Sequence, residues 1–147
     1  MRAIFAVGAV VLALAPSALA DAVYHSSHIA LTPVGSAPLR SGFVENIHPN
    51  GPNIFAHEQY VLNGAQPNTT YTVTIHVGTT SCAPSAQLFS LDTATFTTNR
   101  AGNASTFHVF TPSDVGALMN STIHAYWTVS TGGAVVYQTA CQTIRLD

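Results

Sequence analysis

The feature that most constrains the fold of this chain is a run of alternating side chains within residues 62–77. Threonine or histidine separates its apolar positions, which are Tyr71, Val73, Ile75 and Val77. A period of two is typical of a strand with one face on a core and the other in water. Pro67 and Asn68 come directly before the strand, and both residue types favour turns. A turn that leads straight into a half-buried strand indicates a β-rich fold.

Further segments of this kind follow at short intervals, with glycine, proline and asparagine between them. The strands we expect cover residues 28–34, 39–47, 54–62, 70–77, 87–98, 104–110, 122–130 and 134–146. The side chains expected to face inward on the sixth and seventh of these are Phe107, Val109, Ile123, Ala125, Trp127 and Val129. Evenly spaced strands and turns predict an all-β fold, an antiparallel, immunoglobulin-like Greek-key β-sandwich of seven or eight strands.

One short helix is expected among the strands. Thr111 suits the N-cap, Pro112 suits the first helical position, and Asp114 can complete a capping box. We expect this helix to end near Met119 or Asn120.

The N-terminal residues have the pattern of a secretory signal peptide. Arg2 supplies a positive charge, residues 3–15 are almost all apolar, and residues 18–20 form a small-x-small cleavage site. We therefore expect cleavage after Ala20 and one mature domain over residues 21–147, secreted or held in the periplasm or cell envelope. The apolar run is too short to cross a bilayer core of about 30 Å, so no transmembrane segment is expected.

Charged residues make up only 7% of the chain. After cleavage, three arginines and no lysine accompany six carboxylates, a formal charge of about −3. Nucleic acids and anionic membranes bind basic patches, so neither is expected as a partner.

The chain has two cysteines, Cys82 and Cys141. In an exported protein an even count favours a disulfide, although two buried thiols or a thiolate metal pair are alternatives. A disulfide that closes a loop of about 60 residues stabilises a fold by roughly 4 kcal/mol in the chain-entropy model.

Residues 62–75 have the spacing Leu-x-x-Ala-x-Pro-x-Thr-x-Tyr-x-Val-x-Ile, which resembles the tyrosine-corner segment of fibronectin type III domains. Ala65 stands where that family usually has leucine. The resemblance implies a Greek-key sandwich in which the Tyr71 hydroxyl bonds to backbone just upstream. It covers about sixteen residues, and some 70 follow it, more than in a fibronectin domain, so it implies an architecture and not membership.

A second resemblance covers more of the chain. Gly64-Ala65-Gln66-Pro67, a strand, a loop with Cys82, and Thr139-Ala140-Cys141 near the end are similar to the layout of Cu,Zn superoxide dismutases. That family joins two cysteines in these places by a disulfide. Val73 and Ile75 stand where it has copper-binding histidines, and no counterpart of its zinc-binding histidines follows Cys82. The resemblance implies a shared fold and disulfide without the family's metal site.

The chain contains seven histidines, so a metal site has to be considered. His76, His108 and His124 each fall at an outward position of an expected strand, and they could bind copper or zinc if those strands adjoin in one sheet. No motif with metal-ligand spacing contains them. The alternative is that all three are solvent-facing strand residues.

Hydrolysis needs an activated nucleophile or a spaced carboxylate pair, whereas this chain has no G-x-S-x-G motif and its carboxylates are scattered. His57 and Glu58 are neighbours in an expected strand and so point to opposite faces. We therefore expect a non-catalytic binding or structural module without a cofactor, whose partner is an unidentified protein or glycan at the cell surface. Extracellular copper or zinc binding is the alternative.

Loops at the ends of a sandwich often carry binding residues. Two turn-rich loops, residues 48–53 and 78–85, are the candidates here. The binding residues expected in them are His48, Asn50, Asn53, Thr79 and Thr80.

Overall fold

A computed structural model describes residues 25–48, 56–118 and 120–146. Its strands are β1 (His25–Pro33), β2 (Ser41–His48), β3 (Ala56–Asn63), β4 (Thr70–Gly78), β5 (Gln87–Thr97), β6 (Ala104–Phe110), β7 (Ser121–Thr131), β8 (Ala134–Thr139) and β9 (Gln142–Leu146). The helical segments are η1 (Pro84–Ala86), α1 (Pro112–Val115) and η2 (Gly116–Leu118). The expected signal peptide lies outside the described residues. No described helix has the length and apolar character needed to cross a membrane.

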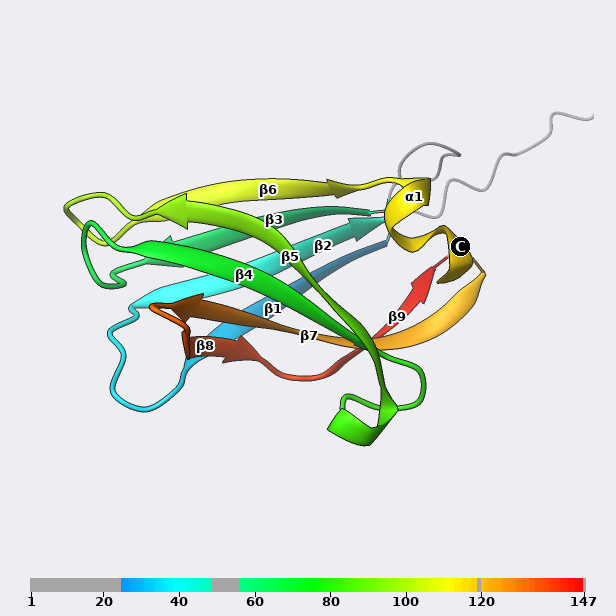
Figure 1. Cartoon of the computed structure of the whole chain (residues 1–147). Coiled ribbons are helices and arrows are strands. Elements are labelled where there is room, and N and C mark those ends of the chain that lie inside the picture. The colour runs from blue at the N-terminus through cyan, green and yellow to red at the C-terminus, as the bar shows by residue number, and fades with distance from the viewer. Residues whose placement is uncertain (1–24, 49–55, 119, 147) are drawn as a thin grey trace, which may run out of the picture.

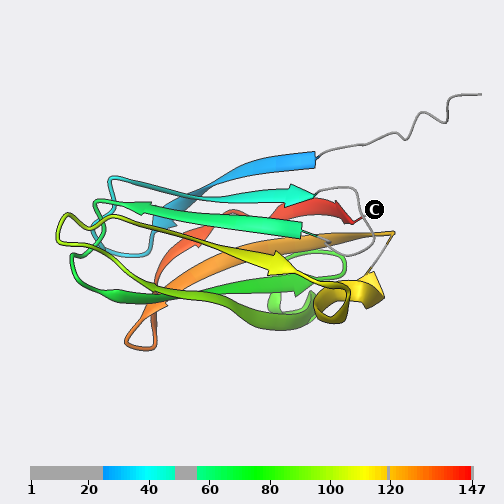
Figure 2. The ribbon, with the colours of Figure 1, turned by 90° about the horizontal axis from the view of Figure 1, so that it is seen from above.

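The strands form one antiparallel sheet in the order β5-β4-β7-β8-β1-β2-β3-β6, with β9 also paired to β7. The sheet folds over at β1, where residues 25–30 pair with β2 and residues 31–33 pair with β8. Figures 1 and 2 show the two resulting layers, β1-β2-β3-β6 and β5-β4-β7 with β8 and β9. The expected all-β antiparallel fold is confirmed, with nine strands in place of seven or eight.

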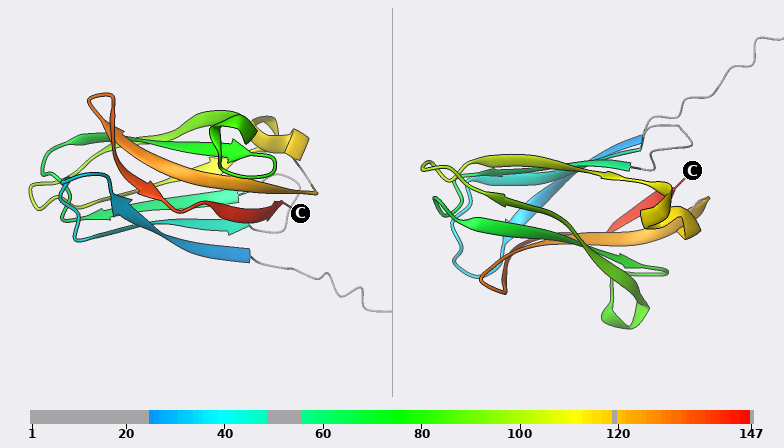
Figure 3. Two further views of the ribbon diagram at one scale, coloured as in Figure 1. Left: turned by 90° about the horizontal axis from the view of Figure 1, so that it is seen from below. Right: turned by 45° about the horizontal axis from the view of Figure 1, so that its top comes forward.

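The two ends of the sheet, β5 and β6, lie on the same side of the molecule. They follow one another in the chain and are joined by the turn at residues 98–103. Figure 3 shows them close together at this turn and diverging toward α1. The sheet is therefore close to a barrel that remains open between β5 and β6.

The final strand expected over residues 134–146 is divided into β8 and β9. Both lie along β7, β8 beside residues 128–131 and β9 beside residues 121–125. Between these ladders, the backbone N–H of Trp127 donates to the hydroxyl oxygen of Thr139 at 3.0 Å. The Thr139 side chain thus accepts a hydrogen bond that a backbone carbonyl accepts in a regular ladder. The break between β8 and β9 leaves Cys141 outside the ladder.

The core lies between the layers and contains the side chains that the alternating patterns select. Tyr71, Val73, Ile75 and Val77 of β4 are buried, as are Ile123, Ala125, Trp127 and Val129 of β7. The Tyr71 hydroxyl lies 3.4 Å from that of Tyr137, which donates to the backbone oxygen of Pro38 at 2.7 Å. The Tyr71 hydroxyl therefore contacts Tyr137 in place of the upstream backbone bond that the fibronectin resemblance implies.

The expected orientation of β6 is wrong. Phe107 is 65% exposed, and Val109 shares its outward face, whereas Phe110 is buried. Register explains the error, because the inward position of β6 beside Glu58 is occupied by His108. The interior is polar at this point, so the apolar residues of β6 do not mark its inner face.

The capping box before α1 is confirmed. The carboxylate of Asp114 accepts a hydrogen bond from the backbone N–H of Thr111 at 2.7 Å, and the N–H of Asp114 donates to the Thr111 carbonyl at 3.0 Å. Hydrogen bonds from the backbone N–H and the hydroxyl of Thr111 to the Asp114 carboxylate hold the pKa of Asp114 below its usual value. Helix α1 ends at Val115, and the chain continues as η2.

The turn between β5 and β6 packs against the turn between β3 and β4. Gly102 has a φ of 75°, and a Cβ at this position would lie 2.0 Å from the carbonyl oxygen of Ala65. The N–H of Ala65 donates to the carbonyl of Gly102 at 3.0 Å. Glycine is needed here both for the left-handed backbone and for the close approach.

Candidate functional site

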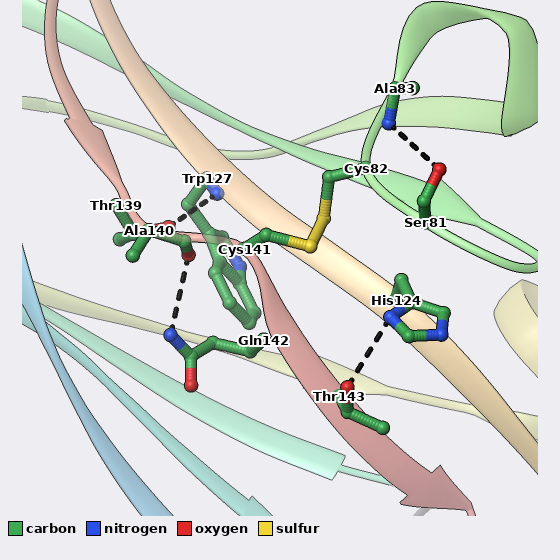
Figure 4. The surroundings of a disulfide bond; sticks show 10 residues. All are labelled: Ser81, Cys82, Ala83, His124, Trp127, Thr139, Ala140, Cys141, Gln142 and Thr143. Carbon is green, nitrogen blue, oxygen red and sulfur yellow. Dashed lines mark hydrogen bonds between the residues drawn. A yellow bond between two sulfur atoms is a disulfide. The ribbon is translucent and has the colours of Figure 1, made fainter.

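The predicted disulfide joins Cys82, in the loop after β4, to Cys141, between β8 and β9 (Figure 4). Its Cα atoms are 5.8 Å apart, within the ordinary range. Trp127 lies next to it on β7 and is fully buried, as expected of a core tryptophan. The disulfide therefore ties the β4–β5 loop to the break between β8 and β9.

The three candidate metal ligands do not come together. His76 and His124 lie on β4 and β7 of one layer, whereas His108 lies on β6 of the other. Within the described ranges, no three histidine, cysteine, aspartate or glutamate side chains could hold a metal ion. The expected cluster required three adjoining strands, and β6, which carries His108, adjoins neither β4 nor β7.

His76 is instead part of a cross-strand polar cluster. Its Nδ1 lies 2.8 Å from the hydroxyl of Ser90 and its Nε2 lies 2.9 Å from that of Thr128, while its ring stacks on Tyr126. Partial burial lowers the pKa of His76, and the charge of Asp92 opposes this change. Both ring nitrogens thus have partners already.

The expected binding loops are only partly described. His48 is the last residue of β2 and is 7% exposed, so it is a buried strand residue and not a loop residue. Asn50 and Asn53 lie outside the described residues. Thr79 and Thr80 are exposed in the loop after β4, where the N–H of Thr79 donates to the carbonyl of Ala86 at 3.1 Å.

A buried carboxylate, Glu58 of β3, is the most unusual group of the interior, with 0% exposure. Asn46 of β2 donates to its Oε1 at 2.7 Å, and the Trp127 indole N–H donates to its Oε2 at 2.8 Å. The hydroxyl of Tyr60 lies 2.5 Å from the same Oε2. A buried carboxyl group needs such partners, since desolvation without them costs several kcal/mol.

Burial raises the pKa of Glu58 from 4.5 to about 7, and its hydrogen bonds to Tyr60, Trp127 and Asn46 oppose the rise. Burial and the neighbouring Glu58 also raise the pKa of Tyr60. The tyrosine therefore stays protonated over the range in which Glu58 titrates.

Glu58 is the group that the sequence interpretation missed. The apolar residues Ala56, Tyr60 and Leu62 alternate along this strand, and Glu58 has the same parity. Alternation alone therefore placed it in the core, although it was treated as one of several scattered carboxylates.

A cavity of about 30 Å³ lies between the layers beside Glu58 and Asn46. Most of its wall is apolar, including Ile123 and Phe110. It has room for water and not for an organic ligand. A wider groove, about 300 Å³, lies on the surface between the start of β5 and residues 112–118.

The outer surface of the β1-β2-β3-β6 layer carries apolar side chains interleaved with polar ones such as Glu45, His57 and Gln59. Cross-strand register and alternation place together the outward side chains that we call the apolar face, Ala30, Phe43, Ile47, Val61, Phe107 and Val109. The ring of Phe107 meets His57 edge-on at 5.5 Å between centroids, and that of Phe43 lies 4.3 Å from His28. Glu45, the carboxylate of this surface, is paired with His28 at 2.7 Å.

The outer surface of the other layer is rich in hydroxyl groups. Thr70 and Thr97 lie opposite each other with hydroxyls 2.8 Å apart, and Thr74 donates to the carboxylate of Asp92 at 2.6 Å. Such polar outward residues are usual for an antiparallel sheet with one solvated side. The apolar face departs from that rule.

No protein-family model matches this chain, and a search of curated proteins finds no match either.

Proposed function

We propose that this chain is an exported, non-catalytic binding module that docks a protein partner through its apolar face. The proposal includes an immunoglobulin-like Greek-key sandwich as scaffold, a signal peptide over residues 1–20, and a secreted or cell-envelope location. The disulfide supports an oxidising compartment, where such bonds persist.

The contrast between the two outer surfaces carries this proposal. Clustered exposed apolar side chains mark interaction sites, and the centres of protein interfaces are enriched in aromatic residues and depleted of charge. The apolar face contains the aromatic residues Phe43 and Phe107, of which Phe107 is 65% exposed, and the neighbouring carboxylate of Glu45 is paired with His28. Its aliphatic members favour a protein over a glycan, since they offer no hydrogen bonds to sugar hydroxyls.

The test is site-specific photo-crosslinking. A photoreactive phenylalanine analogue replaces Phe107 in one sample and Leu88, a 51% exposed residue of β5 outside the apolar face, in the matched control. Each protein is irradiated with the extracellular and envelope fractions of the producing cells. We expect a discrete protein adduct from position 107 and none from position 88. Equal adducts from both positions, no adduct, or retention on a glycan array alone would contradict the proposal.

A further inference from the structure

The hydroxyl of Tyr60 lies between two oxygens of the core. Its oxygen is 2.5 Å from Glu58 Oε2 and 2.7 Å from the hydroxyl oxygen of Thr93. A phenol has one hydrogen, so it can donate in only one of these two contacts. The other oxygen must donate to Tyr60.

Two arrangements satisfy every oxygen of this chain. When Glu58 is ionised, Tyr60 donates to the carboxylate and Thr93 donates to Tyr60. When Glu58 carries its proton on Oε2, that proton is donated to Tyr60, Tyr60 donates to Thr93, and Thr93 donates to the Val73 carbonyl, 3.4 Å away. The bonds from Asn46 and Trp127 are retained in both arrangements, because oxygen keeps free lone pairs in either state.

We propose that Glu58, Tyr60 and Thr93 form a pH-sensitive switch in the core, in which one proton on Glu58 sets the direction of the whole hydrogen-bond chain. The proton is exchanged with solvent, and no covalent bond other than O–H is made or broken. The neutral arrangement removes a charge from the interior and is the more stable fold. The fold is thus more stable in mildly acidic surroundings and loses that added stability as the pH rises to neutral.

The groups that face Glu58 come from every neighbouring strand. Beside Asn46, Tyr60, Thr93 and Trp127, two titratable side chains lie near it. His108 of β6 is its cross-strand neighbour, and His48 of β2 lines the same cavity. A protonated imidazole at either position would favour the ionised carboxylate. Any titration must therefore distinguish the protonation of these two histidines from the protonation of Glu58.

Carbon-detected NMR gives the direct test, because the chain has only two glutamates, Glu45 and Glu58. Protein labelled with ¹³C at the glutamate carboxyl carbon gives two resonances, and the outward Glu45 is the internal control. We expect the Glu58 resonance to titrate near pH 7. A Glu58 midpoint near its unfolded value of 4.5 would overturn the proposal.

The sole tryptophan, Trp127, gives a second readout, since its indole N–H binds Glu58 directly. Its emission should titrate together with Glu58 in the wild type and stay constant in Glu58→Gln. Tyr60→Phe removes a donor to the carboxylate and should raise the NMR midpoint, whereas His108→Asn and His48→Asn should retain the titration. A titration that persists in Glu58→Gln or disappears in either histidine variant would assign the proton elsewhere and overturn the switch.

Discussion

Trp127 and Glu58 are 69 positions apart in the sequence, and the indole N–H of the first donates to the carboxyl of the second at 2.8 Å. Since β7 and β3 belong to different layers, this bond crosses the core and joins the two layers. Such a bond contributes about 0.5–1.5 kcal/mol when Glu58 is neutral and about 1.5–3 kcal/mol when it is ionised. The polar cluster around Glu58 thus fixes how the layers face each other, in addition to the apolar packing.

The raised pKa of Glu58 predicts an unusual dependence of stability on pH. Between its unfolded value of 4.5 and its folded value of about 7, the folded chain holds a proton that the unfolded chain has lost. The free energy of unfolding should therefore decrease with rising pH over this window, by about 3 kcal/mol in total, and level off above it. Denaturant titrations at a series of pH values measure this directly.

Glu58→Gln is the matched variant, because glutamine fills the same space without titrating. Its free energy of unfolding should lack the decrease across the window, whereas Glu45→Gln should retain it. A wild type whose stability rises with pH over that range would show that Glu58 is ionised throughout.

Loss of the disulfide should destabilise the fold without changing its architecture. The bond closes a loop of 59 residues, for which the chain-entropy model gives roughly 4 kcal/mol. Cys82→Ser combined with Cys141→Ser should therefore lower the denaturation midpoint, and so should reduction of the wild type. If reduction leaves the midpoint of the wild type unchanged, the loop after β4 is held in place by other contacts.

Gly102 should tolerate no side chain. Its φ of 75° and the 2.0 Å approach of a Cβ to Ala65 predict that Gly102→Ala costs about 2 kcal/mol or more. Gly116 has a φ of −57° and nothing within 4 Å of its Cβ position, so Gly116→Ala is the control, and we expect it to be neutral or slightly stabilising. Thermal unfolding of both variants checks this pair, and equal midpoints would contradict the steric explanation.

Added copper or zinc should leave the melting temperature unchanged, and so should a chelator. Both ring nitrogens of His76 already have hydroxyl partners, and His108 lies in the other layer. Elemental analysis of the purified protein combined with melting curves tests this. One equivalent of metal and a melting temperature that falls on chelation would revive the histidine site.

Much of the fold follows from local patterns, and much of the candidate site does not. Alternation in β4 and β7 identifies their buried residues, and the capping box before α1 follows from Thr111 and Asp114. Alternation fails for β6 because the interior beside this strand is polar. A prediction from apolar residues assumes that the buried face of a strand is apolar. Glu58 was missed for the same reason. Its position in the alternation of β3 predicts an inward side chain, whereas its charge is typical of a surface residue.

The apolar face could not be found from the sequence because it depends on register. Phe43, Val61 and Phe107 come from three strands, and only their pairing brings these side chains to one surface. The break between β8 and β9 has a similar origin, since it depends on how β7 pairs along its length. Such relationships arise between strands that are distant in the sequence, where local propensity carries no information.

The central claim is that a protein partner binds the apolar face. The most direct test is the affinity of that partner for the Phe107→Ser variant. Phe107 is exposed, so this substitution should leave the fold intact, which circular dichroism would verify. For the partner identified by crosslinking, we expect binding about tenfold weaker or more in Phe107→Ser and unchanged in the matched Leu88→Ser variant. An affinity that is unchanged in Phe107→Ser, or reduced equally in both variants, would show that the apolar face is not the binding surface.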